Sequence, residues 1–234
     1  MDSRPSPYAD GRLHARPDVL RQLAQQRQRP LEAGTHALSF ADGRKAVLHV
    51  PPHADQPGRL LHLVLWLHGA AGQHGGGDHI ALAHAVRHGA LLLIPEAHDT
   101  SWDFLRGGYG PDLAFIDRAL LWTMQRYQVD EQAMAIAGFS DGASYALSVG
   151  LMNGHLFSDI LAFSPGFMAP LRREGLPRVF VAHGKDDRVL PVQRGHAIAR
   201  RLAQEGYDVT YAEFDGAHLV SPTIARAALR RLEE

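Results

Sequence analysis

Cysteine is absent from the 234 residues of this chain. Its absence excludes disulfide bonds, thiolate nucleophiles and any zinc or iron–sulfur site with cysteine ligands. A strong charge is also missing, because 24 basic and 25 acidic residues leave a net charge of -1 with histidine neutral. A near-neutral surface is a poor match for nucleic acid or an anionic membrane, so we expect neither as the main partner.

Long apolar segments are missing as well. No stretch approaches the roughly 18 uninterrupted apolar residues of a membrane-spanning helix, and residues 1–20 lack the apolar centre of a signal peptide. We therefore expect no membrane insertion and a cytoplasmic location. The apolar content of 45% is enough for one substantial core, whereas two domains would be cramped in a chain of this length.

Short apolar runs alternate with amphipathic segments along the chain. The runs predict strands at 34–40, 45–50, 60–67, 90–95, 134–139, 159–163, 178–182 and 208–213, and the amphipathic segments predict helices at 78–87, 112–127, 141–153, 193–205 and 223–232. Alternating strands and helices favour an α/β fold with a mostly parallel sheet and helices on both faces. We expect one domain over residues 31–234, without a large lid domain. Residues 1–30 are predicted to form an N-terminal arm or cover helix.

The sequence around Ser140 carries the strongest chemical signal. An apolar run ends in Gly-x-Ser-x-Gly at 138–142, and a small-residue helical pattern follows. This is the strand, sharp turn and helix of a nucleophile elbow. Gly138 and Gly142 leave room where the turn brings strand and helix together. The serine hydroxyl is therefore expected to stand clear of the sheet, at the N-terminus of a helix.

A serine hydroxyl needs a base, and the base needs an orienting acid. In open α/β sheets these groups sit at the carboxyl ends of strands. The histidines at such places are His68, His98, His183 and His218, and the carboxylates are Glu96, Asp186, Asp187 and Asp215. The expected chain order of serine, acid and histidine is met by Ser140, Asp187 and His218. Spacing alone does not choose between Asp186 and Asp187.

Three motifs give the chain a recognisable resemblance. They are the elbow at 138–143, the pattern His-Gly-x-x-Asp-x-Val-Leu-Pro at 183–191, and Gly-Ala-His-x-x-Ser-Pro at 216–222. Together they resemble the serine α/β-hydrolases, and within them the phospholipase/carboxylesterase-like group with its polyhydroxybutyrate-depolymerase-like bacterial relatives. The resemblance runs from about residue 60 to the C-terminus.

The resemblance implies an α/β-hydrolase fold and a serine carboxylic-ester hydrolase that needs no cofactor. The family pattern places the acid on Asp187, beside Ser140 as nucleophile and His218 as base. It implies an oxyanion hole from the backbone N–H of Asp141 and of Ala70, with Ala71 as the competitor for the second donor. The partner is then a small-molecule ester. A thioesterase or a lysophospholipase is the alternative, and a non-catalytic binding protein on the same fold is a distant one.

Aromatic residues gather in a predicted loop at 96–111, after a central strand. Trp102, Phe104 and Tyr109 in this loop, with Phe167 and Met168 further on, are candidate walls of a substrate pocket. The alternative is that these residues cover the core. A compact chain without a large lid favours an open or shallow pocket, and hence short- to medium-chain acyl esters.

Histidine is abundant, with fifteen residues, which raises the question of a metal. His79, His84 and His88 fall on one predicted helix, and the last two are four residues apart. The helix of a zinc protease carries Glu after its first His, but Ala85 stands there. We therefore expect structural or solvent-facing roles for these three histidines and no metal site.

Overall fold

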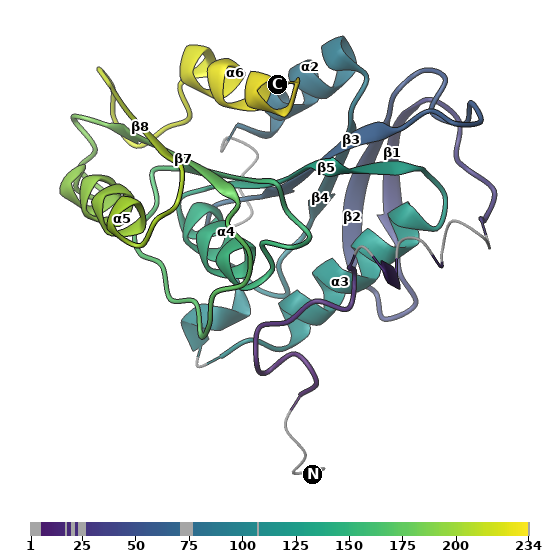
Figure 1. The fold of residues 1–234 in the computed structure, drawn as a ribbon, viewed down its shortest axis with the longest axis horizontal. Coiled ribbons are helices and arrows are strands. Elements are labelled where there is room, and N and C mark those ends of the chain that lie inside the picture. The colour runs from purple at the N-terminus through teal and green to yellow at the C-terminus, as the bar shows by residue number, and fades with distance from the viewer. Residues whose placement is uncertain are drawn as a thin grey trace.

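A computed structural model describes residues 6–16, 18, 19, 22, 27–70, 77–106 and 108–233 of the protein. Its centre is an eight-stranded sheet in the order β1-β2-β4-β3-β5-β6-β7-β8 (Figure 1). The strands are β1 Gly34–Ser39, β2 Lys45–Val50, β3 Leu61–Leu67, β4 Leu91–Pro95, β5 Val129–Phe139, β6 Asp159–Phe163, β7 Arg178–Gly184 and β8 Val209–Phe214. The β1–β2 and β2–β4 pairs are antiparallel, and all other neighbours are parallel.

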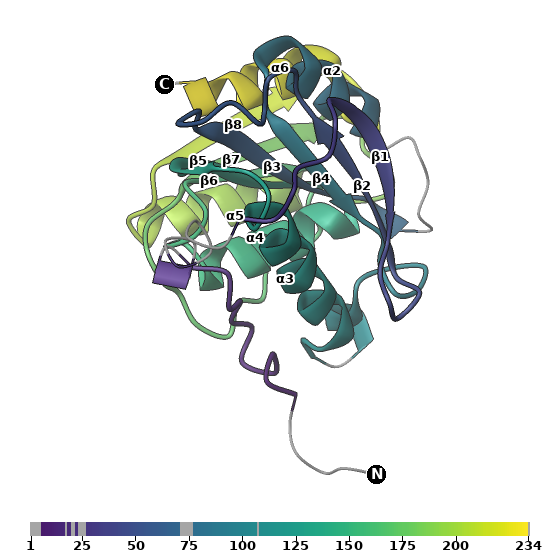
Figure 2. The same cartoon turned by 90° about the vertical axis from the view of Figure 1, so that its right-hand side faces the viewer.

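Helices cover both faces of the sheet. The α-helices of the described residues are α2 Asp78–His88, α3 Pro111–Met124, α4 Asp141–Met152, α5 Gln193–Gln204 and α6 Pro222–Arg230, with short 3-10 helices η2 Asp103–Arg106 and η3 Arg231–Glu233. Helices α2 and α6 lie side by side on one face, and α3, α4 and α5 lie on the other (Figures 1 and 2). Each face has its own apolar core. The predicted single domain with a mostly parallel sheet between two helical layers is confirmed.

The structure differs from the prediction at the start of the central strand. Strand β5 begins at Val129, five residues before the predicted run that begins at Met134. The early part carries exposed polar residues such as Glu131 and Gln132, because it extends beyond the covered part of the sheet and therefore shows no apolar pattern. Part of the segment predicted as an N-terminal arm or cover helix, residues 1–30, lies outside the described residues. Within those residues, no helix combines the length and the apolar character needed to cross a membrane.

The N-terminal segment is fastened to α3 through a buried carboxylate. Asp117 accepts hydrogen bonds from the Tyr8 hydroxyl at 2.9 Å and from the backbone N–H groups of His14 and Ala15 at 2.9 and 2.8 Å. The imidazole Nδ1 of His14 lies 3.0 Å from the same carboxylate. Asp117 itself is fully buried, so its lone pairs are satisfied by this segment rather than by water.

We expect Asp117→Ala to lower the free energy of unfolding by about 2–4 kcal/mol, because it leaves the buried N–H of Ala15 and the partly buried N–H of His14 without an acceptor. Urea unfolding followed by circular dichroism measures the change. Asp10→Ala is the matched control, since Asp10 lies on the same segment in an exposed ion pair with Arg172 and should cost less than about 1 kcal/mol. Equal losses in the two variants would show that the buried carboxylate does not fasten the segment.

Candidate active site

The elbow around Ser140 has the geometry that the motif predicts. Ser140 follows directly on β5 and precedes the first residue of α4, with φ 56° and ψ -119°. A positive φ is strained for a residue other than glycine. The strain is held by the surroundings, since the Ser140 N–H donates to the carbonyl of Phe163 on the neighbouring strand at 2.9 Å. The side chain is therefore presented in a single fixed direction at the edge of the sheet.

The two glycines of the motif stand where no side chain fits. A Cβ on Gly142 would overlap with the carbonyl oxygens of Leu67 and His68, and one on Gly138 would overlap with the backbone of Gly142. These are contacts with backbone atoms, which cannot rotate away as a side chain can. Strand β3, the turn and helix α4 are thus packed backbone against backbone.

We expect Gly142→Ala to lower the free energy of unfolding by about 3 kcal/mol or more, because the overlap forces the elbow and β3 apart. Thermal or urea unfolding measures the effect. Gly166→Ala is a suitable control, because its Cβ would meet side chains instead of backbone: the Leu190 methyl groups at 3.3 Å, which can move, and Ser144 Oγ at 3.7 Å, which is an ordinary contact. A Gly142→Ala protein as stable as the Gly166→Ala protein would contradict the close approach.

The structure brings Ser140, His218 and Asp187 into one hydrogen-bonded chain. The imidazole of His218, which follows β8, has its Nε2 atom 2.9 Å from the Ser140 hydroxyl. Its Nδ1 atom lies 2.6 Å from Oδ2 of Asp187, which follows β7. A carboxylate only accepts, so Nδ1 carries the proton and Nε2 is left as the acceptor facing the serine. The three groups come from the carboxyl ends of three parallel strands.

Burial and hydrogen bonding separate Asp187 from its neighbour Asp186. Asp187 is buried, and it also accepts the N–H groups of Val189 and Leu190 at 2.9 and 2.8 Å, whereas Asp186 is exposed. Burial acts to raise the pKa of the Asp187 carboxyl, but the bonds from His218 and from these N–H groups hold the pKa below its usual value. The ionised form therefore stabilises the fold above the ordinary Asp pKa, and this contribution is lost as pH falls through the lowered pKa.

Two further rings pack against Asp187 and His218, and neither is among the residues predicted for the site. The buried Nε2 of His183 lies 2.8 Å from the Leu190 carbonyl and 3.2 Å from Asp187. The ring of Phe139, next to the serine, packs against the His218 imidazole with centroids 4.7 Å apart. The sequence could have indicated His183, because this residue lies in the same motif as Asp187. It could not have indicated Phe139, because the contact of Phe139 with His218 arises only where the ends of different strands pack together.

The predicted oxyanion donors lie next to the serine along two segments. Asp141 is the first residue of α4, so its N–H is one of those that lack a partner within the helix. On the other side, the turn that contains Ala70 lies close to the elbow. The closeness is shown by Gly69, where an added Cβ would lie 3.4 Å from the Cβ of Ser140. Ala70 is exposed, and the competing donor Ala71 lies outside the described residues.

His68 is clamped within this turn. Its Nε2 accepts the N–H of Ala97 at 3.0 Å, so the proton is on Nδ1, which donates to the Gly69 carbonyl at 2.7 Å. The indole N–H of Trp102 donates to the His68 carbonyl at 3.0 Å, and the two rings pack 4.9 Å apart. The turn is thereby held from two directions.

The predicted pocket residues fall into two groups. Trp102 is only 1% exposed and stacks on Tyr145 with centroids 5.2 Å apart, so it leaves no side-chain surface for a substrate and instead supports the His68 turn. Phe104 and Phe167, by contrast, are half-buried, and Phe104 packs against Phe167 at 5.5 Å and against the buried ring of Tyr109 at 5.2 Å. The remaining candidate, Met168, is partly buried against the core.

A buried carboxylate pair that sequence reasoning did not find fixes the loop of these aromatics. Asp103 accepts the Tyr145 hydroxyl at 2.8 Å, and Asp112 accepts an Arg44 N–H at 2.7 Å and the N–H of Asp103 at 2.8 Å. Burial raises the pKa of Asp103 above its usual value, although hydrogen bonds from the Tyr145 hydroxyl and from the N–H groups of Asp112 and Gly110 oppose the rise. Nothing in the sequence marks Asp103 or Asp112 as buried, and their partner Arg44 belongs to a hairpin that is distant in the sequence.

Two cavities border the site. A cavity of about 830 Å³ reaches His68 from the side of β2 and β4, and its walls include Leu82, Leu92 and Ile94. A smaller one of about 350 Å³ includes Ser101, whose hydroxyl donates to the Asp141 carboxylate at 2.8 Å. Both therefore adjoin the segments that flank Ser140.

A strained serine between a central strand and the N-terminus of a helix, on a mostly parallel sheet, is the architecture of the α/β-hydrolase class. The chain matches the family model described as Phospholipase/Carboxylesterase over residues 117–233, and an esterase family model over residues 39–171. It therefore belongs to the phospholipase/carboxylesterase family of esterases, as the resemblance in its motifs predicts.

The individual relatives have low sequence identity to this chain. The chain is similar to "Probable feruloyl esterase C" of Aspergillus clavatus, with 25% identity over 171 residues, and to the protein of the same name from Aspergillus niger, with 26% over 180 residues. These matches cover 70% and 74% of this chain but only 61% and 64% of those proteins. The fold is similar to that of FphF, a fluorophosphonate-binding serine hydrolase of Staphylococcus aureus, with a TM-score of 0.69, 14% identity, and coverage of 87% of this chain and 98% of that one.

Proposed function

We propose that this protein is a serine carboxylic-ester hydrolase in which Ser140 is the nucleophile, His218 the general base and Asp187 the orienting acid. The observation that carries the proposal is the chain of contacts from Ser140 through His218 to Asp187, at 2.9 and 2.6 Å. Membership of an esterase family supports the same conclusion. The partner is then a small-molecule ester, and the chemistry needs no cofactor.

The proposed reaction has two steps. In the first, His218 Nε2 takes the Ser140 proton as Oγ bonds to the ester carbonyl carbon, and the oxyanion accepts the N–H groups of Asp141 and Ala70. The protonated imidazole gives its proton to the departing alkoxide, which leaves an acyl-serine and an alcohol. In the second, His218 takes a proton from water, the resulting hydroxide attacks the acyl-serine, and the acid is released with Ser140 restored. Asp187 keeps the imidazole in the tautomer that both steps require.

Labelling by a fluorophosphonate probe tests the nucleophile directly, because the probe forms a bond only with an activated serine. We expect wild-type protein to be labelled and Ser140→Ala protein to remain unlabelled. The same experiment separates an enzyme from a non-catalytic binding protein on this fold. An unlabelled wild type would favour the binding protein.

For the substrate we propose short- to medium-chain acyl esters, with Phe104, Tyr109, Phe167 and Met168 as apolar walls. The packing of Phe104 against both Tyr109 and Phe167 supports a compact acyl site. A p-nitrophenyl ester series with acyl chains from C2 to C16 is expected to give its highest kcat/KM at short or medium chains, because longer chains outgrow this cluster. A maximum at C12 or above would contradict the prediction.

The relatives favour a second candidate, an ester of an aromatic acid. Two of them are named as probable feruloyl esterases, and an aromatic ring would pack on the Phe104 cluster. Methyl ferulate measured beside the p-nitrophenyl series distinguishes the two acyl classes by kcat/KM. An acyl-CoA and a lysophospholipid in the same series test the thioesterase and lysophospholipase alternatives, which differ from the main proposal in the leaving group.

A further inference from the structure

A cluster of potential metal ligands lies where α2 meets the end of the chain. Among the described residues, His84, His88 and Glu233 form a group whose ligand atoms all lie within 4.8 Å of one another. The two histidines are four residues apart on α2, so they share one face of the helix. Glu233 belongs to η3, which follows α6, and α6 lies beside α2 (Figure 1).

The three side chains already contact one another. Oε1 of Glu233 lies 2.6 Å from Nδ1 of His88 and 3.9 Å from Nε2 of His84, and the two imidazole rings stack 4.3 Å apart. Ligands about 2.0–2.1 Å from a tetrahedral zinc ion stand roughly 3.4 Å from each other. Small rotations of the side chains would therefore bring the three atoms to ligand positions.

Burial distinguishes His84 from the other two proposed ligands. Its side chain is 3% exposed, whereas those of His88 and Glu233 are 26% and 35% exposed. The buried imidazole is therefore held by the packing around α2, and the two more exposed side chains keep the freedom to turn toward an ion.

We propose that His84, His88 and Glu233 bind one divalent transition-metal ion, with zinc as the expected ion. Two imidazoles and one carboxylate are a recurrent zinc ligand set, and they leave a fourth coordination position open. A cavity of about 460 Å³ between α2 and α6, lined by His84 and His88 among others, provides room for that fourth ligand. The ion would join α2 to the segment after α6.

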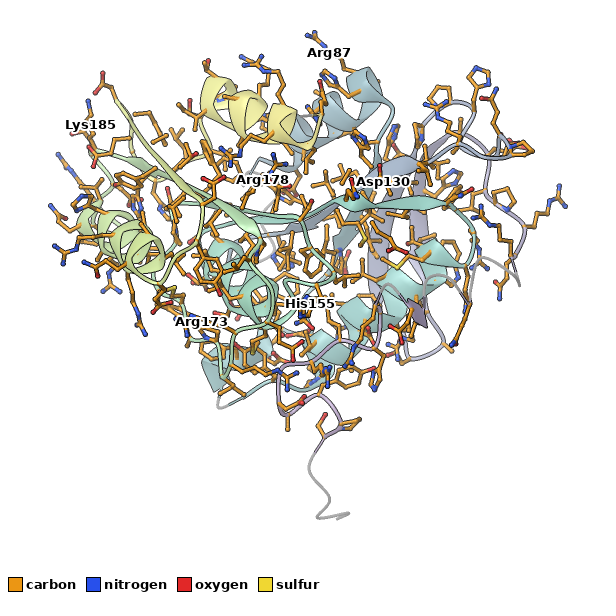
Figure 3. All side chains as sticks on the ribbon, in the orientation of Figure 1. Arg87, Asp130, His155, Arg173, Arg178 and Lys185 are labelled. Carbon is orange, nitrogen blue, oxygen red and sulfur yellow. The ribbon has the colours of Figure 1, made fainter. Side chains whose placement is uncertain are left out.

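Charged groups around the site affect the affinity for the metal ion and the kind of ligand that would fill its fourth coordination position. Arg87, Arg226 and Arg230 line the same cavity and are exposed, and Arg87 lies near the end of α2 and points away from the sheet (Figure 3). Their positive charge opposes a cation, although solvent screens it. One carboxylate leaves a bound divalent ion with a net positive charge, so an anion completes the coordination more favourably than a neutral ligand. Micromolar rather than nanomolar affinity is therefore expected.

Sequence spacing could not predict this site. The histidine pair lacks the Glu at position 85 that marks a zinc protease, and Glu233 is separated from the pair by most of the chain. Only the packing of α6 beside α2 brings the carboxylate to the imidazoles. The site uses none of the groups proposed for ester hydrolysis, so the two functions can be tested independently.

The test is metal binding to untagged, chelator-treated protein, measured by calorimetry with Zn²⁺ and by the visible spectrum with Co²⁺. We expect one ion per chain, a tetrahedral Co²⁺ spectrum, and a rise in Tm on addition of Zn²⁺. His88→Ala and Glu233→Gln each remove one of the three proposed ligands, so each should abolish stoichiometric binding at micromolar Zn²⁺ and the rise in Tm. Both positions are exposed enough for the variants to fold.

His79→Ala is the matched control, because His79 lies on the same helix and lines the same cavity but is not one of the three ligands. It should bind Zn²⁺ like the wild type. The proposal fails if wild-type protein binds no stoichiometric Zn²⁺ at micromolar concentration. It also fails if binding survives in His88→Ala and Glu233→Gln, or if it is lost in His218→Ala instead, which would place the ion at the serine.

Discussion

Ser140→Ala is expected to lower kcat for ester hydrolysis by about 10⁴–10⁶-fold, the range found when a triad nucleophile is removed. The reason is that alanine has no atom to bond to the carbonyl carbon, so the acyl-enzyme cannot form. Activity that remains comes from substrate binding and the oxyanion donors. Steady-state hydrolysis of a p-nitrophenyl ester by both proteins gives the ratio.

The interpretation depends on an intact fold. Ser140 is held at a positive φ by its surroundings, and alanine would be held there in the same way, so the unfolding transition should barely move. Ser39→Ala is the control, since Ser39 is exposed at the end of β1, a strand that carries none of the three proposed groups. Hydrolysis that persists near the wild-type rate in Ser140→Ala would refute the proposed mechanism.

Asp187→Asn should reduce kcat by on the order of 10⁴-fold, the effect seen when an orienting Asp of such a triad becomes Asn. The Asn amide can donate to His218 Nδ1, which favours the tautomer with its proton on Nε2. That tautomer cannot accept the serine proton. Steady-state kinetics of the variant give kcat, and the pH–rate profile of kcat/KM shows whether the pKa of the group that acts as the base differs between the variant and the wild type.

Asp186→Asn is a matched control of the same chemistry one residue earlier. Asp186 is exposed and Asp187 is buried against His218, so the control variant should stay within about twofold of wild type. Equal losses in the two variants would mean that the acid is wrongly assigned. A larger loss in Asp186→Asn would move the assignment to that residue.

Sequence patterns were sufficient for the sheet and for the elbow because both depend on local signals. Runs of buried residues mark the central parallel strands, and Gly138 and Gly142 mark a turn in which backbone touches backbone. The first residues of β5 were not predicted, because this exposed part of the strand lacks the apolar pattern. Local signals therefore predict elements well where the chain is covered on both sides.

Contacts between distant segments were beyond these signals. The choice between Asp186 and Asp187 needed either a family pattern or the fold. The two residues are adjacent, so their distances in sequence from Ser140 and His218 differ by only one position. Trp102 was predicted as a pocket wall, and its burial became clear only from the packing of Tyr145 beside it. The carboxylate of Asp103 and the ligand set with Glu233 likewise arise from helices and loops that meet only in the folded chain.

The placement of His218 beyond β8 has a consequence for how the protein loses activity. Within the described residues, strand β8 pairs only with β7 and stands at the edge of the sheet. It is partly buried along most of its length, whereas Ser140 follows the central β5. Edge elements open by local unfolding at a lower free energy than the middle of a sheet. Loss of esterase activity should therefore precede global denaturation, because the proposed base His218 departs while the proposed nucleophile Ser140 is still held in a native core.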